Sequence, residues 1–391
     1  MRPAIVWLWV LSSAAFAQDQ QVGARAKAMG GSYTAFEDDP VSVWLNPAGI
    51  ATQPSAAGLD YQSYTMYELN ISETVFSSQA ATGWSDPALI PSYLGAVFQL
   101  GSGDVEHAVG LCFSAPFRTK YAFYDVATDL LTDMTQEYYR FRAAYAYDFR
   151  LKPRDKSGFL NHISVGGGID LALTSVRIDQ LATEASTTEP FSESTSAVGV
   201  GGGLGILIGL FDNTTNFKVN LGVAYQSRAG YDFPIQQSVV PQFDWPNQVN
   251  AGATFYLLEG QPLRLTFDLQ WIDWDGATDD SNLKDFGSDD FRDVFNYSAG
   301  AEFRIKVSEK VRLFPRAGFR IFEAPWSDEE ALPSIGWHLL FIETKKSRFT
   351  IFTFGLGVAW RTESGKEWKV DVAGDVGGDA PGFAFGFTLE I

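Results

Sequence analysis

Large apolar residues occupy every second position along most of the chain from residue 57 onward. In the segment 382–391 these are mainly phenylalanines, and they alternate with small or polar residues. In the segment 262–275 the intervening positions are polar or charged, as at Arg264 and Asp268. Alternation with a period of two predicts β-strands whose two faces meet different surroundings. The pattern predicts fourteen strands: 57–69, 90–100, 105–115, 134–149, 160–176, 196–211, 215–228, 247–258, 262–275, 294–307, 309–323, 346–361, 366–376 and 382–391.

The lengths of the connections between these strands indicate an architecture. One apolar and one polar face suit either a β-sandwich core or a barrel in lipid whose polar face lines the lumen. Short connections, such as 307–310, alternate with long ones, which include 70–89, 116–133, 177–195, 229–246, 276–293 and 324–345. An even strand number with short turns at one end and long loops at the other is typical of outer-membrane barrels. We therefore expect an all-β, fourteen-stranded antiparallel barrel over residues 57–391.

The N-terminus has the pattern of an export signal. Arg2 precedes an apolar stretch, and Ala15-Phe16-Ala17 matches the small-x-small cleavage pattern of a signal peptide. About ten apolar residues are too few to span a bilayer as a helix, which argues against a membrane anchor. We expect residues 1–17 to be a signal peptide and the mature chain to begin near Gln18.

Residues 18–56 differ from the strands that follow them. They contain Gly30-Gly31, Asp38-Asp39-Pro40 and Asn46-Pro47-Ala48-Gly49, which favour turns, and little alternation. A compact plug, or hatch, is the better interpretation of this segment. The run from Gly23 to Ala51 resembles the N-terminal hatch of FadL/TodX-type outer-membrane proteins. Further similarity to that family lies at 245–252, 268–274, 316–326 and 354–358.

The resemblance to the FadL/TodX family implies a function. Members are fourteen-stranded barrels plugged by the hatch, and they carry long-chain fatty acids or aromatic hydrocarbons passively across the outer membrane of Gram-negative-type bacteria. The expected partners are the outer-membrane lipid bilayer and a hydrophobic small molecule. PorV-like components of a protein secretion system have a similar hatch and bind partner proteins, so that role is the first alternative. A general porin with an open lumen is the second.

The amino-acid composition argues against several classes of function. With 47 acidic and 29 basic residues the net charge is −18, which removes the electrostatic basis for nucleic-acid binding. The single cysteine, Cys112, has no partner within the chain, and the three histidines lack metal-ligand spacing. No arrangement of Ser, His and Asp on the predicted lumen face indicates catalysis. We expect no enzyme activity, no cofactor and no bound metal.

Three features are candidates for a role in transport. Alternation directs six arginines to the lumen, where a guanidinium group can bind the carboxylate of a ligand. Bracing the wall against the lumen carboxylates Asp170, Asp268, Glu302 and Asp371 is the favoured role for most of them, so we expect at most one or two of these arginines to contact ligand. The six arginines are Arg140, Arg142, Arg264, Arg304, Arg316 and Arg320. An exposed apolar capture surface is predicted in two outer loops at Tyr231, Phe233, Phe243, Trp245, Trp337 and Phe341, unless these residues only pack the loops together. Asn46-Pro47-Ala48-Gly49 is the predicted pivot of the hatch, and Gly110 is a candidate strand kink.

Overall fold

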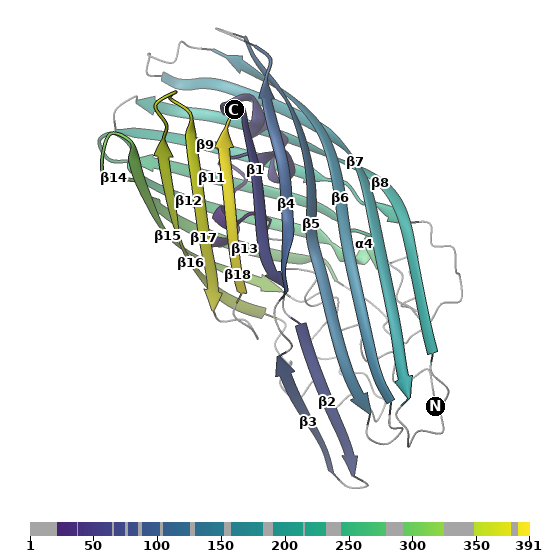
Figure 1. Cartoon of the computed structure of the whole chain (residues 1–391). Coiled ribbons are helices and arrows are strands. Elements are labelled where there is room, and N and C mark those ends of the chain that lie inside the picture. Colours follow the sequence, from purple (N-terminus) through teal and green to yellow (C-terminus); the bar gives the residue numbers. More distant parts are fainter. Residues whose placement is uncertain are drawn as a thin grey trace.

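The chain forms a closed β-barrel (Figure 1). The structure, a computed structural model, describes residues 22–391 except 37, 65, 75–76, 85–87, 102–104, 126–129, 152–157, 183–190, 214–215, 232–243, 279–291, 324–347 and 377–381. Every strand of the ring pairs antiparallel with both neighbours, and β18 pairs with β1 to close it. The predicted fold and its fourteen strands are confirmed.

The ring strands follow one another in chain order. They are β1 (Ala56–Tyr64), β4 (Ala88–Gln99), β5 (Val105–Asp125), β6 (Leu130–Arg150), β7 (Gly158–Ala182), β8 (Phe191–Asn213), β9 (Phe217–Gln226), β11 (Asn247–Leu257), β12 (Leu263–Asp273), β13 (Val294–Phe303), β15 (Val311–Glu323), β16 (Arg348–Arg361), β17 (Glu367–Val376) and β18 (Gly382–Glu390). The remaining strands and the helix outside the plug are β2 (Met66–Thr74), β3 (Ser77–Trp84), β10 (Gly230–Tyr231), β14 (Ile305–Lys306) and α4 (Trp274–Thr278).

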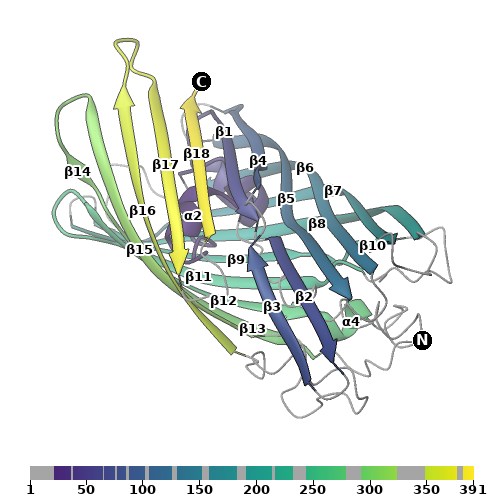
Figure 2. The same cartoon turned by 60° about the horizontal axis from the view of Figure 1, so that its bottom comes forward.

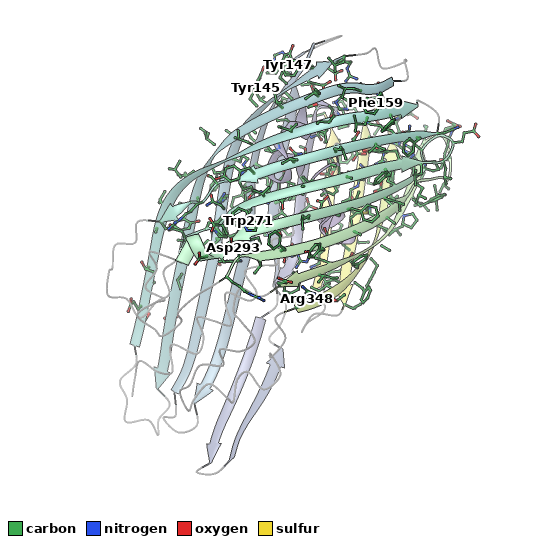
Figure 3. All side chains as sticks on the ribbon, turned by 180° about the vertical axis from the view of Figure 1, so that it is seen from behind. Tyr145, Tyr147, Phe159, Trp271, Asp293 and Arg348 are labelled. Atoms are coloured by element: carbon green, nitrogen blue, oxygen red, sulfur yellow. The ribbon has the colours of Figure 1, made fainter. Side chains whose placement is uncertain are left out.

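The wall is apolar outside and polar inside. On β7 and β8 the outward side chains of Ile169 and Val200 are 73% and 72% exposed, and similar residues project from strands all around the ring. The inward positions between them carry buried polar residues, such as Thr266 and Asp371. Figure 3 shows the side chains on the ribbon, with Tyr145, Tyr147 and Phe159 near the end that carries the short turns. A soluble β-sandwich would bury its apolar face in a core. Because the apolar face is exposed here, the strands form the wall of a barrel in lipid.

The segment before β1 fills the inside of the barrel. It contains α2 (Ala24–Ala28), α3 (Ser42–Leu45) and the 3₁₀ helix η1 (Pro47–Ala51), and Figure 2 shows it surrounded by the wall strands. All three elements are short because they are turns of a packed plug. Among the described residues, no helix is long and apolar enough to cross a membrane.

Glycines in the wall let the plug backbone come close. A Cβ on Gly166 would lie 2.5 Å from the carbonyl carbon of Pro47, and one on Gly222 would lie 2.4 Å from the oxygen of Thr34. A Cβ on Gly300 would lie 2.6 Å from a plug oxygen as well, that of Met29. These contacts are with backbone, which cannot rotate away. The glycines therefore act as seats for the plug.

Two predictions about the outer loops are wrong. The connection 70–89 contains the hairpin β2–β3, and β2 pairs in parallel with the outer part of β5. Strands β5 to β8 also continue well past their predicted outer ends, so that 116–133 and 177–195 are largely strand (Figure 1). Strands that continue beyond the lipid no longer need an apolar face, so the alternation of apolar and polar residues did not reveal them.

The close contact between the wall glycines and the plug can be tested by replacing two neighbouring glycines of β7, one facing inward and one facing outward. Gly166→Ala should lower the stability of the barrel by about 1–3 kcal/mol, because the added methyl group overpacks the seat of Pro47. At Gly167, which faces outward, a Cβ would meet the flexible side chain of Leu204, at 3.1 Å, and the backbone oxygen of Gly203 at 3.5 Å, which is an ordinary van der Waals contact. Gly167→Ala should therefore melt close to the wild type. Thermal unfolding of the detergent-solubilised proteins, followed by circular dichroism, measures both; equal melting temperatures would contradict the role of the seat.

Candidate functional site

Glu302 on β13 is the centre of a buried ion network that joins plug and wall. Its carboxylate accepts two hydrogen bonds from Arg25 of the plug, from Nε and Nη2, each at 2.9 Å. From the wall, Nε of Arg316 donates at 2.6 Å and Nη1 of Arg264 at 3.1 Å. Glu302 is fully buried, so these three guanidinium groups replace the water that it would otherwise need.

Asp38 and Asp371 balance the charge of this network. Asp38 accepts hydrogen bonds from Arg25 at 2.7 Å and from Arg264 at 2.8 Å, and Asp371 accepts one from Arg316 at 2.6 Å. Desolvation raises the pKa of the Asp38 carboxyl, but the charges of Arg25 and Arg264 outweigh it and hold that pKa well below its usual value. Three guanidinium groups face three carboxylates, so this network acts as a brace between plug and wall.

The other predicted lumen arginines lie in different surroundings. Arg304 is at the turn end of the barrel, where its Nη2 donates to the carbonyl oxygen of Gly260 at 2.6 Å. Its role as a ligand contact stays a prediction. Arg320 is buried on the inner face of β15, with its guanidinium carbon 5.0 Å from the centre of the Phe322 ring.

A second buried cluster, nearer the loop end, contains Arg140, Arg142 and Asp170. Arg142 makes a bidentate pair with Asp170, with Nε and Nη2 at 2.6 and 2.7 Å from the two oxygens. Its Nη1 also donates to the carbonyl oxygen of Trp44 in the plug, at 2.7 Å. Arg140 shares the same carboxylate, through Nη1 at 3.0 Å. Two arginines thus meet one acidic side chain.

Aromatic rings frame this cluster. The guanidinium carbon of Arg140 lies 5.1 Å from the centre of the Trp245 ring and 5.7 Å from that of Trp44. Tyr138 lies 5.5 Å from Trp245 and 6.0 Å from Tyr231, between ring centres. We call Arg140, Trp44, Tyr138, Tyr231 and Trp245 the aromatic cluster.

The aromatic cluster corrects one prediction. Tyr231 and Trp245 are only 8% and 2% exposed, so they do not form the exposed apolar surface expected of them. The chain turns inward there, because the backbone N–H of Tyr231 donates to Asp244 and Ala229 bridges to Trp245. The other predicted members of that surface, Phe233, Phe243, Trp337 and Phe341, lie outside the described residues.

A belt of amide side chains also lines the lumen at this level, and sequence reasoning missed it. Gln226 on β9 faces Gln248 on β11 in register, and its Nε2 donates to the carbonyl oxygen of Trp44 at 3.1 Å. Gln270 donates to Gln248 at 3.4 Å, and Asn296 donates to Gln270 at 2.9 Å. Alternation alone shows that these residues face inward, but only the strand register brings them to one level. Tyr138 was missed for the same reason, and Trp44 was missed because its place depends on the fold of the plug.

The predicted pivot is a fixed corner of the plug. Asn46 donates from Nδ2 to the carbonyl oxygens of Thr34, at 2.7 Å, and of Ile206 on β8, at 3.3 Å. Its Oδ1 accepts from the backbone N–H of Ala48, at 3.2 Å, and so caps η1. The side chain therefore ties two parts of the plug to each other and to the wall.

The regular pairing of the wall is interrupted between β4 and β5. Their pairing ends at Tyr93 and Ser114, and beyond Ser114 the register between β5 and β6 shifts across Ala115 and Pro116. The hydroxyl of Tyr93 donates to the carbonyl oxygen of Pro40 in the plug. Gly110 pairs regularly on both sides, so its prediction as a kink is wrong; a Cβ there would meet Val43 of the plug at 2.7 Å.

In the part of the chain that the structure describes, no group of His, Cys, Asp and Glu side chains suits a metal ion. No protein-family model and no curated protein matches the chain. Solved structures do match over nearly its full length. They include the Ralstonia pickettii toluene transporter TbuX (15% identity, TM-score 0.59, 96% of this chain and 99% of that chain).

Two further solved structures are similar. A Pseudomonas aeruginosa FadL homologue matches with 13% identity and a TM-score of 0.60, over 94% of this chain and 98% of that one. The P. putida toluene transporter TodX matches with 14% identity and a TM-score of 0.58, over 96% and 99%. The chain is a plugged fourteen-stranded barrel of the outer-membrane type. More particularly, it has the FadL/TodX fold that its hatch predicted.

The brace at Glu302 predicts a large stability effect. Glu302→Gln removes the buried negative charge that Arg25, Arg264 and Arg316 share. Removing one partner of a buried ion pair lowers the free energy of unfolding by about 3–5 kcal/mol. We expect a lower melting temperature and faster protease cleavage within the plug. Glu309→Gln is the control, since that carboxylate pairs with Lys306 on the surface. The brace is refuted if both variants melt and are cleaved like the wild type.

Proposed function

We propose that this protein is an outer-membrane channel for the passive uptake of hydrophobic compounds such as long-chain fatty acids or aromatic hydrocarbons. The observation that supports this most is the combination of a lipid-facing apolar wall with a lumen closed by a packed plug and lined by the aromatic cluster. The similar structures named for toluene transport and for FadL agree with it. The proposal includes export by residues 1–17 and residues 18–56 as the plug.

The geometry suggests a route for the cargo. A hydrophobic molecule would enter from the loop end and reach the aromatic cluster, where burial of its apolar surface favours binding. The plug blocks the direct path along the barrel axis. A lateral exit fits the interrupted pairing between β4 and β5, next to Tyr93, because the ladder between these strands ends there. Such an exit would release the cargo into lipid.

This route needs no covalent chemistry and no cofactor. The steps are binding, displacement of plug contacts and diffusion. Tyr93 is suited to link the last two, because its hydroxyl holds the backbone of Pro40 at the wall break. When the plug moves at Pro40, the wall loses a contact at the same place.

Ligand binding gives a direct test. The purified, detergent-solubilised protein should bind a fluorescent long-chain fatty acid saturably, with competition by unlabelled fatty acids or aromatic hydrocarbons. Trp245→Ala should weaken this binding by about tenfold or more, since it removes a large buried aromatic surface from the cluster. Trp360→Ala removes the same side chain from the outside of the wall, where Trp360 stacks on Trp368, and should bind like the wild type.

The alternatives make opposite predictions in the same preparation. A PorV-like partner-binding protein would bind neither class of ligand, and Trp245→Ala would change nothing. If the protein is a general porin, the wild type should conduct ions in a planar bilayer, whereas a plugged channel should not. Absence of saturable binding overturns the transport proposal.

A further inference from the structure

The aromatic cluster carries an unbalanced positive charge. Arg140 and Arg142 share the single carboxylate of Asp170, whereas each arginine of the brace contacts at least two carboxylates. Arg142 takes both oxygens of Asp170 in a bidentate pair, so Arg140 keeps one bond to that carboxylate, at 3.0 Å. Its other partners are uncharged: the carbonyl oxygen of Ser227, at 3.5 Å, and the hydroxyl of Tyr231. The nearby Arg228 pairs with Asp244 and adds no net charge. Arg140 is therefore the arginine here whose charge is least compensated.

Hydrogen-bond donors without partners surround this charge. Among the described residues, Arg140 Nε, Trp245 Nε1 and Gln248 Nε2 are buried and have no hydrogen-bond acceptor. The acceptor Gln226 Oε1, on the strand next to Gln248, is in the same state. A buried donor that lacks a partner is costly, and native proteins rarely keep one without a reason. Three donors beside an extra positive charge suit an anion with several acceptor lone pairs.

Contacts bring these donors together around Trp44. Gln226 donates to the carbonyl oxygen of Trp44, and it faces Gln248 directly across β9 and β11. Arg140 contacts the rings of both Trp44 and Trp245. The donors thus belong to one place, above the plug.

The remaining surface of that place is aromatic. Tyr138, Tyr231 and Trp245 have ring centres 5.5 and 6.0 Å apart, in tilted pairs. Edge-to-face and tilted contacts favour a further flat ring over a flexible alkyl chain, which loses more conformational entropy when it is ordered.

We propose that the aromatic cluster binds an aromatic monocarboxylate, with its carboxylate on Arg140, Trp245 Nε1 and Gln248 Nε2 and its ring among the aromatic side chains. This inference rests on the proposed function and narrows its cargo. Charge-assisted hydrogen bonds to a guanidinium group distinguish such a ligand from a neutral hydrocarbon of the same shape. The carboxylate would complete the charge balance that Asp170 leaves incomplete.

Isothermal titration calorimetry with three matched probes tests the proposal. We expect 3-phenylpropanoate to bind the wild-type protein about tenfold or more tightly than 3-phenylpropan-1-ol, which has the same skeleton without the charge. We expect it to bind severalfold more tightly than octanoate, which keeps the charge but has no ring. Arg140→Gln should remove most of the preference for the acid over the alcohol while leaving alcohol binding within about twofold.

Two further variants keep the test decisive. Arg177→Gln removes one positive charge from an exposed pair with Asp179 near the loop end, and should keep the wild-type preference. Trp245→Phe keeps an aromatic ring and removes one donor, so it should weaken acid binding and spare alcohol binding even if Arg140→Gln fails to fold. Equal binding of acid and alcohol by the wild type overturns the carboxylate site, and octanoate binding as tightly as 3-phenylpropanoate overturns the aromatic specificity. Either result leaves the proposed function standing if the fluorescent fatty acid still binds; loss of all binding overturns both.

Discussion

The close approach of plug backbone to barrel wall is the constraint on which the rest of the structure depends. A polar chain segment inside a barrel must satisfy its backbone groups, and the wall supplies partners such as Asp268, whose carboxylate accepts from the backbone N–H groups of Tyr33 and Thr34, each at 2.8 Å. Such bonds form only where the wall has no side chain in the way, as at Gly222 next to Thr34. The same strands thus provide both the room for the plug backbone and the partners for its hydrogen bonds.

Charge has two different uses inside this barrel. At the turn end, the brace around Glu302 balances its charges and so holds the plug in place. Nearer the loop end, the cluster around Arg140 is unbalanced and lined with rings. A balanced network has little to gain from an additional ion, whereas an unbalanced one gains a partner. If the aromatic cluster binds the proposed ligand, the two clusters divide structural support and recognition between the two ends of the lumen.

The sequence predicted the wall well because alternation records directly which face of a strand meets lipid. It placed Arg264 and Arg316 on the inner face but could not say that Arg264 binds Asp38 of the plug, or that both arginines share Glu302 with Arg25 of the plug, since that depends on the fold of residues 22–55. Tyr231 and Trp245 were expected at the surface, because no local pattern reports that a loop turns inward. The outer halves of β5 to β8 were missed because strands beyond the lipid lose the apolar signal.

The contact between Arg25 and Glu302 spans 277 positions of the chain, and Lys27 reaches Asp375 on β17. The plug comes first in the sequence, yet its strongest partners belong to strands near the end. Contacts between residues so far apart in the sequence form late and slowly during folding, because closing the long loop between them costs conformational entropy before the contacts contribute any stabilisation. We therefore expect the plug to become fixed only after β13 and β17 have joined the barrel, so that its packing would complete barrel assembly.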